Sequence, residues 1–216
     1  MKLFTQEEFD NFPIVDGYKQ YPSGDYTKIK KFEDDCIFGE YCKFGEYCEF
    51  GINCSFREDC EFGNGCKFGR YCEFGRKCSF GDHCEFGNGC KFWYNCEFGR
   101  NCSFREDCEF GNECFFNEEC TFGFACSFRE FCVFEGKCVF ETGHVAKKGY
   151  PLLGFSGFGT MNRTTYFFNC TDGIWVRCGC FFGDIEQFRE QVKKTRKGRI
   201  RKEYLMIANF VEIKWM

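Results

Sequence analysis

The chain has 216 residues, of which 44% are hydrophobic and 21% aromatic, so it can fold around a sizeable core. No apolar run approaches the length of a membrane span, and the first eight residues contain no apolar signal region. We therefore expect a cytoplasmic protein that does not enter a membrane.

The net charge of −4 is unevenly distributed along the chain. Residues 1–35 carry eight acidic and five basic side chains, residues 36–140 carry eighteen and eleven, and residues 141–216 carry seven and thirteen. The middle of the chain is therefore acidic and its last third is basic.

Residues 1–31 are predicted to form an N-terminal cap. Thr5 and Glu8 have the spacing of a capping box, so we expect a short helix over residues 6–12. Such a cap would cover the open end of whatever repeat structure follows.

Four aromatic residues connect this cap to the next segment. Phe4 and Phe9 occupy the positions of a hydrophobic staple around the helix start. Tyr26 and Phe32 stand in the register of the later phenylalanines, which indicates that the repeat begins before its first cysteine.

Residues 32–141 are organised by a six-residue repeat. A cysteine stands at every sixth position from Cys36 to Cys138, and a phenylalanine follows each cysteine two residues later, giving the motif C-x-F-G-x-x. A period of six does not fit an α-helix, but it suits a short strand followed by a corner. The repeat therefore predicts a β-solenoid.

The repeat resembles that of the left-handed β-helix, the hexapeptide-repeat fold. In that family a small inward residue precedes a bulky inward residue by two positions, and a small residue follows; Cys, Phe and Gly take these places here. The resemblance implies a mainly β fold, built as a triangular, left-handed parallel β-helix with three hexads in each coil.

The outward-facing charges discriminate between three and four sides. The residue between Cys and Phe reads K, E, S, E three times over from Lys43 to Glu109. Four hexads per coil would stack lysine on lysine, whereas three would stack Glu73, Lys91 and Glu109 as alternating charges. The pattern favours three sides, and eighteen hexads then form about six coils.

Eighteen of the 21 cysteines belong to the repeat. Disulfide frameworks are typical of secreted proteins, so without a secretory signal we do not expect one here. The short C-x2-C pairs that are typical of metal centres are also absent from the sequence. We interpret the repeat cysteines as small packing residues and expect neither a metal nor another cofactor.

Departures from the repeat identify candidate sites. Arg57, Trp93 and Arg129 fall in one corner column, two coils apart, with Tyr94 next to Trp93. Tryptophan, tyrosine and arginine are enriched at binding hot spots, so we interpret these four residues as a partner-binding site. The alternative is that they rest against another part of the same chain.

A second departure is a set of outward positions that become apolar towards the end of the repeat: Phe115, Phe124, Phe131, Val133 and Val139. We expect this set to be covered by the C-terminal segment or by a second copy. A homo-oligomer is therefore expected, with a dimer as the favoured state.

Residues 142–216 are predicted to form a small α+β domain. A Thr-Asp-Gly turn between residues 163–169 and 174–182 predicts a hairpin, and Asp184 caps a helix that runs to about Lys194. A basic loop and a last helix with an apolar face follow.

The basic run is a candidate anion-binding site and contains Lys193, Lys194, Arg196, Lys197, Arg199, Arg201 and Lys202. We favour a solvated loop, or a contact with the acidic solenoid of another copy, over direct binding of nucleic acid. The reason is that no aromatic residues interleave these charges.

The segments YPLLGFSGFG, RTTYFF and RCGCFFGDIEQF resemble the tails of uncharacterised Cys/Phe-rich β-helical proteins of phages and gut bacteria. This resemblance implies no catalytic residues, and we identify none. Two alternatives stay open in the tail. One is a zinc site formed by Cys170, Cys178, Cys180 and His144, and the other is ligand binding or catalysis around Gly157, Gly159, Arg163 and Arg177.

These observations favour a non-enzymatic interaction protein that binds an unidentified host protein. We expect a phage-encoded inhibitor of a bacterial defence system, such as a CRISPR or nuclease effector, acting in the host cytoplasm. The alternative is a structural or virion-associated assembly protein. A DNA mimic is disfavoured because the repeat has a net charge of −7, against about 17 phosphate charges on duplex DNA of the same length, about 29 Å.

Overall fold

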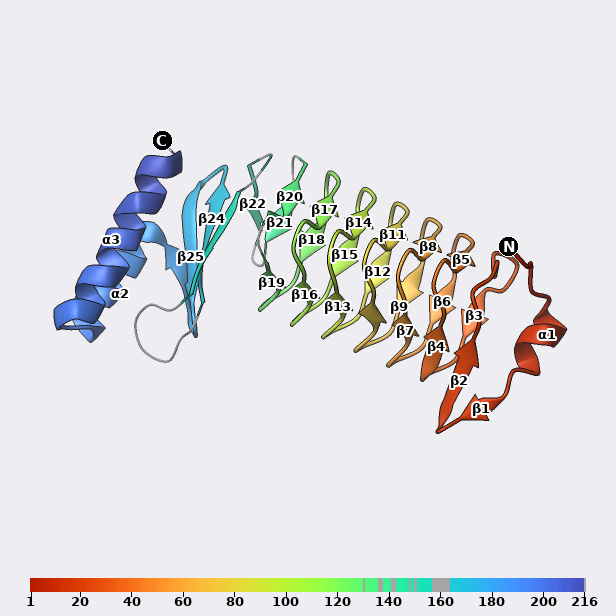
Figure 1. The fold of residues 1–216 in the computed structure, drawn as a ribbon. Helices are drawn as coiled ribbons and strands as arrows, with labels where there is room; N and C mark the ends of the chain where they lie inside the picture. The colour runs from red at the N-terminus through yellow and green to blue at the C-terminus, as the bar shows by residue number, and fades with distance from the viewer. Residues whose placement is uncertain are drawn as a thin grey trace.

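The structure is a computed structural model that describes residues 1–129, 131–135, 138–140, 143–147, 149, 151–156 and 164–215. The fold is mainly β, as predicted: a β-solenoid of about seven turns is followed by an antiparallel sheet and two helices (Figure 1).

Three sheets form the sides of the solenoid, with parallel pairing except at the end strands β1 and β22. The first sheet has the order β1 (Ile14–Val15), β2 (Tyr18–Tyr21), β4 (Cys36–Phe38), β7 (Ser55–Phe56), β10 (Glu73–Phe74), β13 (Lys91–Phe92), β16 (Glu109–Phe110), β19 (Ser127–Phe128). The second has the order β20 (Val133–Phe134), β17 (Phe115–Phe116), β14 (Glu97–Phe98), β11 (Ser79–Phe80), β8 (Glu61–Phe62), β5 (Lys43–Phe44). The third has the order β22 (His144–Val145), β21 (Val139–Phe140), β18 (Thr121–Phe122), β15 (Ser103–Phe104), β12 (Glu85–Phe86), β9 (Lys67–Phe68), β6 (Glu49–Phe50), β3 (Lys31–Phe32).

The register confirms the coil of 18 residues that the outward charges predicted. Lys91 pairs with Glu73 on one side and Glu109 on the other, and its Nζ lies 3.6 Å from the Glu73 carboxylate. In the third sheet the Nζ of Lys67 lies 3.1 Å from the Glu85 carboxylate. The outer faces therefore carry stacked, mutually neutralising charges.

The eighteen cysteine hexads form the six coils predicted, and a further turn without cysteines precedes them, which gives about seven turns in all. In this turn Tyr26 stacks on Phe44 and Phe32 stacks on Phe50, with ring centroids 5.6 and 4.5 Å apart. The early start of the winding was predicted from the register of these two residues.

The core consists of three columns of stacked phenylalanine rings. Phe86, for example, lies nearly parallel to Phe68 and Phe104, with centroids 4.9 and 4.8 Å away. It also meets Phe80 and Phe92 of the other two columns edge-on at 5.0 Å. Each ring therefore combines offset stacking within its column with edge-to-face contact between columns, the two favoured aromatic geometries.

The repeat cysteines are buried free thiols, and they do more than fill space. The Sγ of Cys96 donates to the carbonyl of Gly75 at 3.3 Å, and every repeat cysteine from Cys54 onward makes the same bond to the residue 21 positions earlier. The adjacent Cys60 thiol and burial both raise the pKa of Cys42. The repeat thiols thus act as hydrogen-bond donors to corner carbonyls.

Aromatic side chains close the N-terminal end of the solenoid. Helix α1 (Gln6–Asp10) begins with the predicted capping box but ends two residues earlier than predicted. Phe4 stacks on Tyr26 at 4.9 Å and Phe9 stacks on Tyr21 at 4.5 Å, so the two predicted staple residues each extend a different column of rings.

The C-terminal part is a four-stranded antiparallel sheet with helices packed against it. The elements are β23 (Leu152–Phe155), β24 (Thr165–Cys170), β25 (Gly173–Cys178), β26 (Phe181–Asp184), α2 (Ile185–Thr195) and α3 (Gly198–Trp215). The predicted hairpin and the Asp184 cap are confirmed. The strand predicted over 174–182 is instead two strands, because Gly179 takes a positive φ of 62° and turns the chain back.

We predict that Phe86→Ala lowers the free energy of unfolding by about 3–5 kcal/mol, because the ring is fully buried and its loss leaves a cavity. Phe86→Leu retains most of the apolar volume and should cost less. Urea unfolding followed by circular dichroism measures both changes. A loss below about 1 kcal/mol for the alanine variant would contradict the account of the core.

We also predict that a thiol reagent such as dithiobisnitrobenzoate modifies about one cysteine in the native protein, Cys180, with slow partial reaction of half-buried Cys178. All 21 thiols should react once the protein is denatured in guanidinium. Rapid modification of many thiols in the native state would show that the repeat cysteines are not sealed in the core.

Candidate functional site

One edge of the solenoid carries the predicted binding residues, and we name it the Trp93 corner. It is the column of turns that joins the first sheet to the second, at residues 39–41, 57–59, 75–77, 93–95, 111–113, 129 and 131. The structure brings Arg57, Trp93, Tyr94 and Arg129 to this one corner, and all four are exposed.

The backbone of the Trp93 corner is held by neighbouring coils on both sides. The carbonyl of Tyr94 accepts a hydrogen bond from the Lys77 N–H at 3.0 Å, and the Asn95 N–H donates to the Asn112 carbonyl at 2.9 Å. Asn95 has a φ of 57°, as do the equivalent residues of other corners within a few degrees. The side chains at this corner therefore project from a fixed backbone.

Trp93 stands clear of its own column. Its side chain is 62% exposed. Gly75 and Gly111 occupy the same position one coil before and one coil after, and a Cβ added at Gly111 would lie 2.4 Å from the Trp93 carbonyl oxygen. Close approach of the coils thus excludes a side chain at Gly111, and both flanking coils leave space around the indole.

Tyr94 is oriented by a polar contact. Its hydroxyl donates to the Glu113 carboxylate in the next coil at 2.8 Å, and this hydrogen bond raises the pKa of Tyr94. Arg57 and Arg129 lie two coils to either side of Trp93, about 10 Å away along the axis at about 4.8 Å per coil. A partner could therefore contact the ring pair and either cation together.

Two further exposed aromatic residues, Tyr41 and Phe131, lie on the same corner. Both occupy the third corner position, which has a positive φ that disfavours bulky residues. Phe131 was assigned to the apolar patch, and Tyr41 was missed. The signal that could have found Tyr41 is its place one residue before a cysteine, in the column of Phe131.

The structure divides the predicted apolar patch into separate places. Phe115 and Val133 stack as neighbours on the outer face of the second sheet, half-exposed. Val139 pairs with Val145 of the terminal strand β22. Phe124 lies beneath the guanidinium of Arg177, 5.5 Å from ring centroid to Cζ. The five residues therefore do not form one continuous surface.

Arg177 joins the C-terminal sheet to the solenoid. Its guanidinium donates to the Cys126 carbonyl at 2.9 Å and lies over both Phe124 and Phe168. Burial lowers the pKa of this arginine. Its side chain serves the internal junction, whereas Gly157, Gly159 and Arg163, the other members of the predicted ligand site, lie outside the described residues.

Much of the basic run is helical and partly engaged. Only Arg196 and Lys197 lie between α2 and α3, so the predicted basic loop is much shorter than expected. Arg201 donates to the carbonyls of Arg196 and Lys193 at 2.7 and 2.8 Å, and Arg199 pairs with Glu203 at 2.5 Å.

The structure does not bring the residues of the predicted zinc site together. Cys170 and Cys178 lie at opposite ends of the hairpin, because Cys170 pairs with Gly173 and Cys178 pairs with Thr165. The Asp172 carboxylate instead accepts a hydrogen bond from the His144 Nδ1 at 2.8 Å, and the His144 ring stacks on Trp175. Among the residues that the structure describes, no group of three or more His, Cys, Asp or Glu side chains could hold a metal ion.

Within the described part of the chain, no helix is both long and apolar enough to cross a membrane. Comparisons with protein-family models, curated proteins and solved structures find no match to this chain. Function must therefore be inferred from the geometry of the molecule itself.

We predict that Arg177→Met lowers the free energy of local opening of the C-terminal sheet by roughly 1.5–3 kcal/mol. The reason is that the Cys126 carbonyl loses a charged donor at a buried site. Hydrogen exchange should show faster exchange of the β24 and β25 amides, with unchanged protection in the middle of the solenoid. Arg100→Met, at an exposed corner position, is the matched control. Equal exchange rates in both variants would contradict the claim that Arg177 holds the C-terminal sheet to the solenoid.

Proposed function

We propose that this chain is a non-enzymatic binding protein that contacts its partner through the Trp93 corner. The observation that carries the proposal is the largely exposed indole of Trp93 on a backbone hydrogen-bonded to coils on both sides. Binding hot spots are enriched in Trp, Tyr and Arg, and a preorganised side chain loses little entropy on association. Arg57 and Arg129 would supply charged contacts at the rim.

Within this function, we propose a phage-encoded inhibitor of a bacterial defence effector, such as a CRISPR or other nuclease. The resemblance of the tail segments to phage proteins supports this assignment. Charge mimicry of DNA is the weaker mechanism, because outward carboxylates such as Glu61 and Glu85 pair with the lysines Lys43 and Lys67. A rigid surface that occupies an active or nucleic-acid-binding face is the favoured mechanism.

We predict that Trp93→Ala combined with Tyr94→Ala weakens partner binding about 30-fold or more, which corresponds to a hot-spot loss of about 2 kcal/mol. The partner is isolated by affinity capture from lysate of a bacterium that carries defence systems, and its affinity is then measured with purified components. The variant should keep the circular dichroism spectrum and melting temperature of the wild type, since both side chains are exposed.

The matched control is Tyr47→Ala, which removes an exposed aromatic side chain from a different corner. It should bind like the wild type. In a plating assay, the wild type and this control should restore growth of a restricted phage, whereas the double variant should not. Unchanged affinity of the double variant would refute the proposed contact, while tight binding without restored plating would refute only the inhibitor role.

The second candidate is a structural or virion-associated assembly protein. Phe115 and Val133 favour it, because two half-exposed apolar side chains stack on the face of the second sheet, where earlier coils carry charged or serine side chains. Light scattering separates the candidates: a dimer that Phe115→Lys dissociates would support assembly through this face, and a monomer at micromolar concentration would oppose it.

A further inference from the structure

The outermost face of α3 carries an apolar stripe that nothing within the described chain covers fully. Met206, Phe210 and Ile213 are 62%, 52% and 73% exposed, and their spacing of four and three residues places them on one side of the helix. Lys202 and Arg199 continue the same side towards the helix start and are exposed, with Arg199 also paired to Glu203. The face is therefore basic at one end and apolar at the other.

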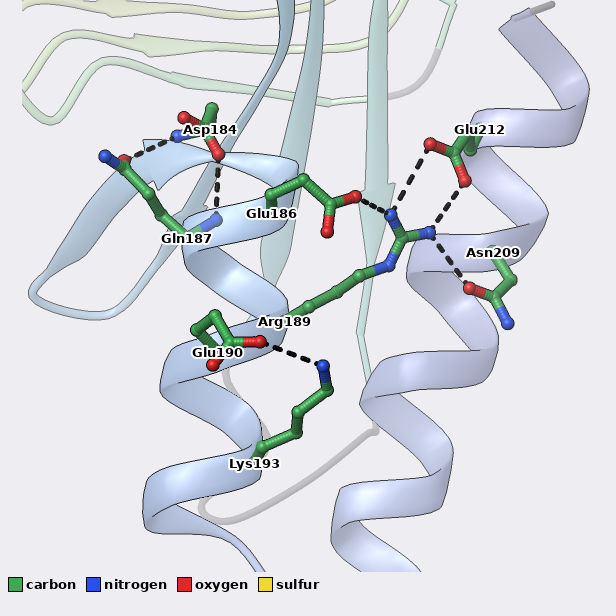
Figure 2. A network of polar contacts seen from close by, with 8 residues as sticks. All are labelled: Asp184, Glu186, Gln187, Arg189, Glu190, Lys193, Asn209 and Glu212. Carbon is green, nitrogen blue, oxygen red and sulfur yellow. Dashed lines mark hydrogen bonds and ion pairs between the residues drawn. The ribbon is translucent and has the colours of Figure 1, made fainter.

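An ion-pair network keeps this face turned outward. Arg189 of α2 reaches across to Glu212 at 2.8 Å and Asn209 at 2.9 Å on α3, and it also contacts Glu186 (Figure 2). The opposite side of α3 packs on the sheet through buried residues that include Ile207 and Val211. The helix is thus fixed against rotation, with Phe210 left at the surface.

The other end of the molecule has the complementary character. The hairpin of β1 and β2 turns at Asp16 and Gly17, which both have positive φ, and it exposes Ile14, Val15 and Tyr18. These apolar side chains are accompanied by acidic ones, since α1 next to the hairpin exposes Glu7 and Asp10.

Figure 1 places α3 and the β1 hairpin at opposite ends of an elongated molecule. A single copy therefore cannot bring its own two faces together. We propose that the outer face of α3 in one copy binds the β1 hairpin and α1 of a second copy, head to tail. Apolar side chains would meet apolar ones, while Arg199 and Lys202 would face the acidic end.

Such a contact uses two different surfaces, so it is heterologous and leaves a free face at each end for further copies. The solenoid would then extend into a linear assembly with its Trp93 corners exposed along the sides. This inference is independent of the proposed partner, because it involves neither the Trp93 corner nor the face with Phe115 and Val133.

Two double variants test the contact from both sides. Met206→Asn with Ile213→Asn removes apolar area from the α3 face, and Ile14→Asn with Val15→Asn removes it from the hairpin, in neither case adding charge. Sedimentation velocity over a concentration series should show growth beyond a dimer for the wild type and a monomer of 25.5 kDa for each variant alone. Salt at 0.5 M should weaken wild-type association on the order of tenfold, because the charged contacts are screened.

The decisive measurement is a mixture of the two variants. Each retains one intact face, so a head-to-tail contact predicts a species of twice the chain mass that grows no further. A monomeric wild type at all concentrations would overturn the proposal, as would variants that each still dimerise alone, which would indicate a symmetric contact. The control Phe115→Lys should assemble like the wild type.

A vesicle-binding assay tests the other possible occupant of the α3 face. If the wild type binds vesicles rich in phosphatidylserine without self-association, and the α3 variant does not bind them, the face belongs to a membrane and the proposal is overturned.

Discussion

The stacking of each phenylalanine on its counterpart one coil away is the interaction on which the rest of this structure depends. Phe74 and Phe92 lie 4.9 Å apart and within 3° of parallel, and this separation is close to the spacing of strands in a sheet, about 4.8 Å. Backbone pairing and ring stacking therefore favour the same coil spacing. Because three columns of rings fill the interior, the residue beside each ring must be small, and cysteine meets this need while donating to a corner carbonyl.

That compact coil determines how the corners are built. At Gly111 the coils approach so closely that a side chain would collide with the preceding backbone, whereas the positive φ falls two residues later, at Glu113. The glycines of the motif thus permit close approach, and a non-glycine residue often carries the backbone strain. Large side chains such as Trp93 can occupy the glycine position only in some coils, which isolates them and makes this edge a discontinuous row of contacts.

Much of the solenoid was predictable because its repeat leaves few alternatives. The charge pattern around Lys91 gave the correct 18-residue coil, and the register of Tyr26 indicated the early start.

The tail was harder to predict. The alternation around Cys178 resembles one strand although Gly179 reverses it, and outward apolar positions reveal an exposed face but not which segment covers it. Hence Phe124 could not be assigned to Arg177 before the junction was seen. Partner binding at the Trp93 corner stays a prediction.

In a repeat of this kind, the sides and the two ends of the solenoid are suited to different functions. Along the sides, each coil presents nearly the same chemistry, and charges such as those of Glu73 and Lys91 neutralise each other in register. The repeat keeps an acidic excess of seven charges, but these are spread over similar coils, so specificity along the sides depends on rare deviations from the motif. The two ends escape this averaging, because they are unrelated in sequence: α1 beside the N-terminal hairpin is acidic, whereas α3 has a basic excess. A repetitive side with one irregular corner suits recognition of a different molecule, whereas unlike ends suit recognition of another copy.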